Sequence, residues 1–223
     1  MLFHPIQTMS IVTDEVIVNY SGGKDSAIVL DLCSRYFKKV HVFFMYIVPG
    51  LSFQENLMTW AEKRYGVSVL RIPHFILGNM LKFGVFRVED FDVPTIDVVD
   101  TYAYVRKFFD CHWIAGGERA KDSIQRNAQL KKSGSINKVR GRFFPIMYWD
   151  KAQVFGYIKR HKLRIAPEAK HLGHSFRALD AQDLLGIKRH YPSDYEKVKA
   201  SFPFIEAEIL HHELATKKQA SKV

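Results

Sequence analysis

Apolar runs separated by polar turns divide the first third of the chain into alternating strands and helices. The β-branched run 16–20 predicts a buried strand, and runs 40–48 and 67–72 predict two more. Apolar residues at helical spacing between these runs predict helices over about 24–37 and 51–65. This β-α-β-α-β order is typical of a parallel sheet with right-handed crossovers.

The rest of the chain continues this pattern and then becomes helical. We expect a helix over 95–110, a strand over 111–115 and another strand at 143–144. Residues 74–95 are too apolar for a solvated loop and predict a helical lid that packs over the sheet edge. Asp150 is placed to cap a further helix. The helices predicted after that residue cover 151–161, 176–186, 194–201 and 204–214.

These elements predict an α/β fold, a Rossmann-like three-layer sandwich around a mostly parallel sheet. We expect a single domain over 1–223, with a core over about 14–160 and a helical C-terminal part over about 161–215. No run of about eighteen apolar residues occurs, and residues 1–14 lack a secretory signal pattern, so no membrane association is expected. Two cysteines are too few for a disulfide framework, which favours a cytoplasmic location.

The balance of charge changes this picture by pointing to anionic partners. The formal net charge is +10 and the sequence pI is about 9.5. Such an excess favours nucleotides, nucleic acid, or phosphorylated and sulfated metabolites. A solvated basic surface without a partner is an equally good explanation, and the oligomeric state stays open.

The turn between the first strand and the first helix carries the strongest chemical signal. It consists of Ser21, Gly22, Gly23, Lys24, Asp25 and Ser26. Two glycines let the backbone approach a ligand, and the first N–H groups of a helix have no internal partner. Lys24 and the two serine hydroxyls add charge and donors, so the turn predicts a site for a phosphate chain. It is not a Walker A loop, because Asn19 stands where that motif needs glycine.

This hexapeptide after a strand resembles the PP-loop of the ATP-pyrophosphatase superfamily, whose fold is described as adenine nucleotide alpha-hydrolase-like. The resemblance implies that the loop holds the pyrophosphate part of ATP, with Lys24 in a catalytic role and chemistry at the α-phosphate. It also implies that Met45 and Tyr46 line the adenine pocket, although plain core packing is the alternative. Asp25 is expected to be catalytic as well, as the nearest carboxylate for the Mg²⁺ that accompanies ATP.

A second motif follows the predicted strand 111–115. Its members are Gly116, Gly117, Arg119, Ser123 and Arg126. The motif resembles a signature of the phosphoadenosine phosphosulfate (PAPS) reductase branch, and Pro145 and Trp149 resemble a third signature of that branch. Two arginines seven residues apart share a face if the segment is helical, and arginine binds phosphate or sulfate in a fork.

We expect Gly116 and Gly117 to contact the nucleotide and Arg119 to stabilise charge during the reaction. Arg119, Ser123 and Arg126 are expected to bind substrate, with a solvated amphipathic helix as the alternative. The basic segment 131–142 predicts a mobile loop whose Lys138 and Arg140 bind an anionic acceptor or nucleic acid, unless it is only a surface loop.

Missing residues separate this chain from the reductases. Those enzymes use a cysteine near the C-terminus, whereas Cys33 and Cys111 are expected in the core. We therefore expect ATP and Mg²⁺ as cofactors, without an iron–sulfur cluster and without zinc or another protein-bound metal. The predicted reaction is ATP cleavage at the α-phosphate, with pyrophosphate release and adenylation of an unknown acceptor. The alternatives are an adenine-nucleotide-binding protein without redox catalysis and a nucleic-acid-modifying factor.

Overall fold

The computed structural model describes residues 2–122, 128, 130, 132, 134–176 and 178–220. The chain divides into two compact units, and the prediction of a single domain stays a prediction. The first unit consists of Met1–Phe44, Leu57–Ile72 and Val99–Ala166. The second consists of Met45–Asn56, Pro73–Val98 and Pro167–Val223.

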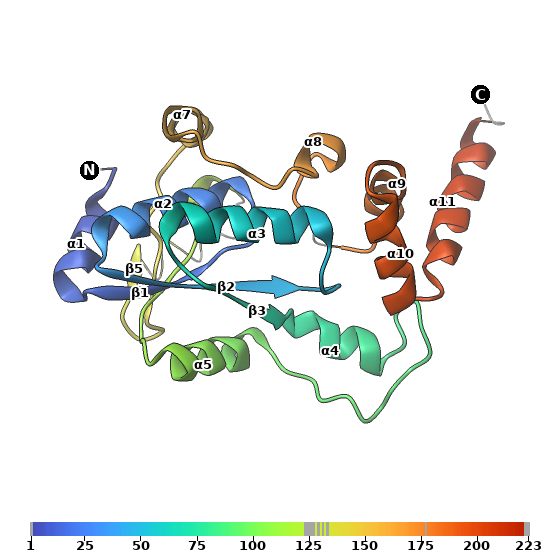
Figure 1. Cartoon of the computed structure of the whole chain (residues 1–223), viewed down its shortest axis with the longest axis horizontal. Coiled ribbons are helices and arrows are strands. Elements are labelled where there is room, and N and C mark those ends of the chain that lie inside the picture. Colours follow the sequence, from blue (N-terminus) through green and yellow to red (C-terminus); the bar gives the residue numbers. More distant parts are fainter. Residues whose placement is uncertain are drawn as a thin grey trace. The chain divides into compact units, whose positions relative to one another are not determined.

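Strands and helices are interspersed up to the end of β6 at Phe143, and the described elements after that residue are helices (Figure 1). The strands are β1 (Glu15–Asn19), β2 (Lys39–Tyr46), β3 (Val69–Pro73), β4 (Ile114–Ala115), β5 (Ile136–Asn137) and β6 (Arg142–Phe143). The helices up to residue 122 are α1 (His4–Val12), α2 (Lys24–Tyr36), α3 (Ser52–Tyr65), α4 (Phe75–Lys82), α5 (Val98–Phe109) and the 3-10 helix η1 (Ala120–Asp122). The later helices are α7 (Lys151–His161), α8 (Ala169–Leu172), α9 (Ala181–His190), α10 (Pro192–Ser201) and α11 (Ile205–Ala220).

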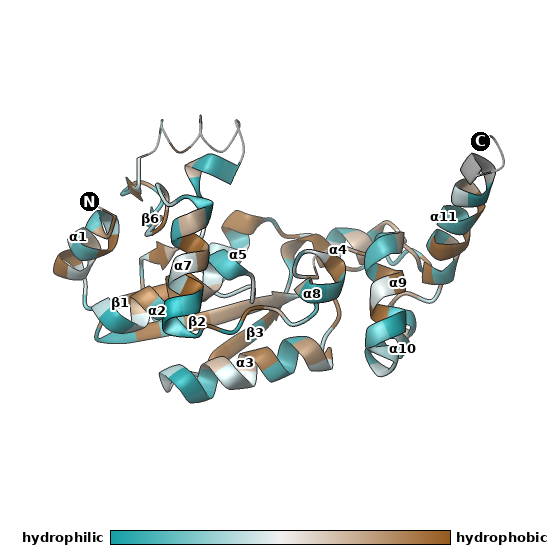
Figure 2. Ribbon diagram, turned by 90° about the horizontal axis from the view of Figure 1, so that it is seen from above, coloured by the Kyte–Doolittle hydropathy of each residue, from teal (hydrophilic) through white to brown (hydrophobic). Residues whose placement is uncertain are grey.

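Six strands form one sheet in the order β3-β2-β1-β4-β6-β5. Strand β1 runs parallel to β2 and β4, and β4 runs parallel to β6. The short β5 and β6 form an antiparallel pair. Figure 2 shows hydrophobic residues concentrated in the strands, whereas most helices alternate hydrophobic and hydrophilic residues. The predicted α/β class with a mostly parallel sheet is therefore confirmed.

Helix α2 is held in the first unit by a buried acid. Asp31 is 1% exposed and accepts hydrogen bonds from Arg35 Nε at 2.7 Å, Tyr157 Oη at 2.7 Å and Tyr65 Oη at 3.1 Å. Burial by itself would raise the pKa of Asp31, but the bonds from Arg35 and Tyr157 hold it below its ordinary value. One carboxylate thereby ties together α2, α3 and α7.

A second buried acid orders the helical unit. Asp194 is fully buried and accepts hydrogen bonds from Ser52 N at 2.8 Å and from the Ser52 hydroxyl at 2.6 Å. It therefore satisfies donors at the start of α3 that have no intrahelical partner. The predicted helix within 74–95 is present as α4, and its apolar residues pack on the helical core of this unit.

Three local features differ from the sequence-based expectations. Helix α1 was not predicted, although Pro5 lies in its first turn and Ile6 and Met9 are buried. Helix α9 begins at Ala181, because the Asp180 carboxylate accepts a hydrogen bond from the backbone of the first turn. The segment 131–142, expected to be a basic loop, contains β5 and the first residue of β6, which pair with each other. Within the described residues, no helix combines the length and apolarity needed to cross a bilayer.

Candidate functional site

The candidate site lies where three neighbouring strands end. Register pairs Val18 of β1 with Ala115 of β4, and Ala115 with Phe143 of β6. Because these strands are parallel, the segments that follow them start at the same edge of the sheet. Ligands of open α/β sheets bind at such an edge. The sequence-predicted turn after β1 and the Gly116-Gly117 segment after β4 are therefore neighbours, as expected.

The turn after β1 presents backbone donors from the start of α2. Gly23 is the N-cap residue, and Ala27 N donates to Gly23 O at 3.0 Å. The N–H groups of Lys24, Asp25 and Ser26 therefore precede the first hydrogen bond of the helix. At this end the helix dipole is positive, so the three N–H groups favour an anion.

Serine hydroxyls shape the turn itself. Ser26 Oγ donates to Gly23 O at 2.9 Å and lies 3.1 Å from Ser21 Oγ. Gly22 has a φ of +77° and its carbonyl accepts a hydrogen bond from Ala166 N at 2.8 Å. Since a side chain is strained at this φ, glycine is required for the turn to keep its shape.

The glycines after β4 have close neighbours, and Gly117 approaches the start of α2. A Cβ on Gly117 would lie 3.2 Å from the Asp25 carbonyl carbon and 3.3 Å from Ser26 N. A Cβ on Gly116 would collide with the side chains of Glu118 and Arg142. The absence of a side chain at Gly117 therefore permits the close approach of the two sequence motifs, and its absence at Gly116 leaves room for the Glu118 and Arg142 side chains.

Four charged side chains alternate in sign beside the turn. Lys24 Nζ lies 2.8 Å from Asp25 Oδ2, and Arg119 Nη2 lies 2.6 Å from Asp122 Oδ1. Arg119 Nε is 3.1 Å from Asp25 Oδ1, an ion-pair distance, but its N–H does not point at that oxygen. Arg119 is 3% exposed, whereas the Lys24 side chain is 36% exposed. Arg119 therefore contacts Asp25 from the buried side, and Lys24 is the more accessible cation.

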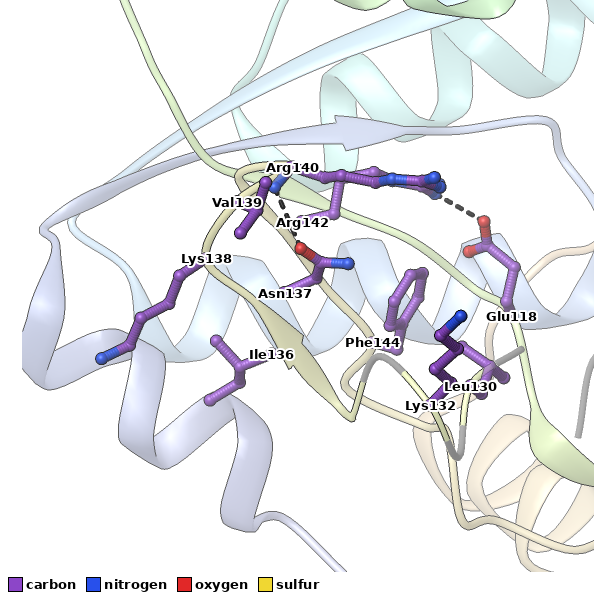
Figure 3. A pocket seen from close by; sticks show the side chains of 10 residues that line it. All are labelled: Glu118, Leu130, Lys132, Ile136, Asn137, Lys138, Val139, Arg140, Arg142 and Phe144. Atoms are coloured by element: carbon purple, nitrogen blue, oxygen red, sulfur yellow. Dashed lines mark hydrogen bonds and ion pairs between the residues drawn. The ribbon is translucent and has the colours of Figure 1, made fainter. Parts of the chain in front are cut away.

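A basic cavity of about 910 Å³ lies in the same unit (Figure 3). Its charged lining residues are Glu118, Lys132, Lys138, Arg140 and Arg142. Arg142 forms an ion pair with Glu118, and its guanidinium lies over the rings of Tyr102 at 4.9 Å and Phe144 at 5.0 Å. Glu118 precedes Arg119 in the chain, so the cavity continues the charged cluster beside the turn.

The structure describes some of the predicted site residues and not others. Lys138 and Arg140 share the cavity, whereas Ser123 and Arg126 lie outside the described residues. Met45 and Tyr46 belong to the second unit, so their adenine role stays a prediction. Sequence reasoning placed Glu118 and Asp122 in the second motif and Arg142 in the basic segment but assigned none of them a role, although both acids flank Arg119 closely enough to be candidates for its partners.

Both cysteines are buried, as expected. Cys33 is fully buried and Cys111 is 6% exposed. Burial raises the pKa of each thiol, which opposes formation of the reactive thiolate.

Family membership follows from a sequence match that spans more than half of the chain. Residues 15–167 match the family model described as a phosphoadenosine phosphosulfate reductase domain. The chain belongs to this family. It is thereby a member of the PP-loop superfamily of adenine-nucleotide-binding proteins, as the motifs predicted. No curated protein matches the sequence.

Solved structures share the fold of this PAPS reductase family member at low identity. A tRNA thiolase from Methanococcus maripaludis is 15% identical with a TM-score of 0.53, covering 92% of this chain and 78% of that chain. A PAPS reductase from Candida auris, in a phosphate complex, is 18% identical with a TM-score of 0.52, covering 78% and 85%. A variant of FMN adenylyltransferase from Candida glabrata is 15% identical with a TM-score of 0.51, covering 77% and 59%.

One expectation is wrong in the light of these structures. We expected ATP and Mg²⁺ without any iron–sulfur cluster, because the chain has two cysteines. The thiolase of the same fold was solved with its 4Fe–4S cluster. An iron–sulfur cluster is therefore compatible with this fold, and its absence does not follow from the resemblance that we used.

Proposed function

We propose that this family member binds ATP and cleaves it between the α- and β-phosphates, adenylating an anionic acceptor and releasing pyrophosphate. The observation that carries the proposal is the start of α2, where three backbone N–H groups precede the first helical hydrogen bond beside Lys24. Such an arrangement binds phosphate groups and stabilises the charge of a leaving pyrophosphate. The similar structure named FMN adenylyltransferase supports adenylyl transfer as the reaction class.

Each charged residue then has a separate role in the proposal. Lys24 exchanges its 2.8 Å contact with Asp25 for a phosphate oxygen, since it is the accessible cation of the cluster. Arg119 is a positioning residue, because it is buried and contacts Asp25 and Asp122. Such catalysis depends on positioning and electrostatics and needs no covalent intermediate with the protein.

The acceptor is assigned to the basic cavity. Lys132, Lys138 and Arg140 contribute positive charge there, and Arg142 is partly neutralised by Glu118. This distribution of charge favours an acceptor that carries phosphate, sulfate or carboxylate groups. A nucleic acid meets the same description, and steep weakening of binding by salt would identify it.

Equilibrium binding tests the proposal before any acceptor is known. We expect ATP to bind the purified chain, inorganic pyrophosphate to compete with it, and Lys24→Ala to weaken both by at least about tenfold, the loss of one charge-assisted contact. Lys38→Ala is the matched control, because Lys38 is exposed and pairs with Asp14. Equal affinity of ATP for the Lys24→Ala and Lys38→Ala proteins would contradict the proposal.

The burial of both cysteines favours one second candidate, an adenine-nucleotide-binding protein without redox catalysis. Cys33 and Cys111 are covered by the protein, so neither is presented to a bound sulfonucleotide. Tight nucleotide binding without product, with or without a cell extract as acceptor source, would favour this candidate over adenylyl transfer.

A further inference from the structure

Three side chains with metal-binding atoms converge at the opposite ends of the strands from the candidate site. They are Glu15 at the start of β1, His41 in β2 and Cys111 just after α5, and their ligand atoms all lie within 4.8 Å of one another. His41 Nε2 lies 2.9 Å from Glu15 Oε2. All three residues belong to the first unit.

The register of the β1–β2 pair brings Glu15 and His41 together. Glu15 pairs with Lys39, and Ile17 pairs with His41, in the parallel β1–β2 ladder. Since side chains two residues apart share a face of a strand, Glu15 and His41 project to the same side of the sheet. Lys39 shares this face, and its Nζ lies 3.4 Å from Glu15 Oε2.

The turn at the end of α5 positions Cys111. Asp110 has a φ of 49°, and Cys111 N donates to Arg106 O at 3.1 Å. This left-handed residue and the six-to-one hydrogen bond form a Schellman turn, which stops the helix and reverses the chain. Cys111 is thereby turned back towards the strands, while the ring of Phe109 packs at 4.7 Å on that of His41. Helix and strands thus hold the three donors in place.

We propose that Glu15, His41 and Cys111 bind a divalent transition metal of the zinc class. One sulfur, one imidazole nitrogen and one carboxylate oxygen form a donor set that suits Zn²⁺ and does not suit Mg²⁺ or Ca²⁺. Three protein ligands leave one tetrahedral position for water or another ligand. Cys111 and His41 are mostly covered, whereas the Glu15 side chain is 37% exposed, so the open position faces solvent beside Glu15.

The positive charge of the neighbouring Lys39 does not prevent a metal ion from binding at this site. Lys39 is 66% exposed on its side chain, so it can move into water when a cation occupies its place beside Glu15. The sequence-based expectation of no zinc rested on the lack of ligands near one another in sequence. Here the ligands come from positions 15, 41 and 111 and meet only through strand register and the turn after α5.

Cobalt titration of the metal-free chain tests the proposal. We expect one equivalent of Co²⁺ to produce a thiolate-to-cobalt charge-transfer band in the near ultraviolet, and Zn²⁺ to abolish it by competition. Cys111→Ser and His41→Asn should lose the band. Cys33→Ala and His112→Asn should keep it, because Cys33 is buried elsewhere and the exposed His112 ring packs edge-on against Trp113.

The Glu15→Gln variant is a milder change, so it tests metal binding in a protein that is expected to stay folded. Its side chain is partly exposed, so we expect native circular dichroism and an affinity for Co²⁺ at least tenfold below that of the unchanged protein. Absence of the thiolate band in the folded unchanged protein would overturn the proposal. So would a band of equal strength in folded Cys111→Ser, since the metal would then bind elsewhere. Neither readout depends on ATP, so this proposal and the proposed function can fail separately.

Discussion

Gly117→Ala tests whether the close packing of the two motifs forms the phosphate site. The new methyl carbon would lie 3.2 Å from the Asp25 carbonyl carbon, 3.3 Å from Asp25 Cβ and 3.3 Å from Ser26 N. All three distances are shorter than ordinary van der Waals contact, so the first turn of α2 must shift by a few tenths of an ångström. Overpacking of this kind costs about 1–3 kcal/mol.

Nucleotide binding should weaken in this variant while the protein stays folded. The methyl group covers Ser26 N, which is one of the three N–H groups assigned to phosphate. Loss of one such contact, at about 1.4 kcal/mol for each factor of ten, predicts an affinity for ATP roughly tenfold lower. Gly117 lies outside the left-handed region, so alanine strains no backbone angle there and the fold should persist.

Isothermal titration with ATP, together with urea unfolding, measures both effects. Gly156→Ala is the matched control, because a Cβ at this position in α7 would meet nothing within 4 Å. Replacing a glycine in a helix interior should stabilise the control by up to about 1 kcal/mol without changing its affinity for ATP. ATP binding by folded Gly117→Ala that equals that of the unchanged protein would refute the assignment of the α2 N-terminus.

Three further predictions concern stability and are read from urea unfolding curves. Gly22→Ala should destabilise by at least about 1–2 kcal/mol, since φ is +77° and the added Cβ would lie 2.7 Å from Leu57 Cδ2; an unchanged midpoint would contradict this. The pKa of Asp31 is lowered in the folded protein, so ionised Asp31 stabilises the fold fully at pH values above the ordinary pKa of 3.8. This stabilisation is lost as the pH falls from 3.8 through the lowered pKa of the folded state. Asp31→Asn should remove that part of the acid dependence, and an unchanged pH profile would count against it. Asp194→Ala should cost about 1–3 kcal/mol, because the Ser52 backbone N–H and hydroxyl at the start of α3 lose their buried acceptor, and a shift below about 0.5 kcal/mol would disagree.

The parallel core and the phosphate turn could be predicted because their signals are local. The run Val16-Ile17-Val18 is fully buried, and its β-branched composition announces a central strand. The glycine pair before Lys24 marks the strand-to-helix turn in the same way. The Asp150 cap was predicted too, and Asp150 forms a reciprocal capping box with Gln153.

The remaining features depend on contacts between distant residues. The β5–β6 pair consists of two-residue strands, too short to show an alternating pattern. Nothing in the sequence indicates that the Arg142 guanidinium lies over the ring of Tyr102, forty residues away. Likewise, the 4.8 Å cluster that includes Cys111 exists only because of strand register and a helix-ending turn. Motif reasoning therefore located the turn and the Gly116-Gly117 segment with Arg119 beside it, but not the ion-pair partners of these residues.

The central claim is cleavage of ATP between the α- and β-phosphates at the turn that carries Lys24. The most direct measurement is to incubate the chain with magnesium-ATP, with and without an extract of small molecules and RNA, and to identify the products by mass spectrometry. We predict pyrophosphate together with AMP or an adenylated acceptor, in amounts that fall at least about a hundredfold in Lys24→Ala, as for loss of a main electrostatic contact to the leaving group. ADP and inorganic phosphate as the products, or equal turnover by folded Lys24→Ala, would contradict the account.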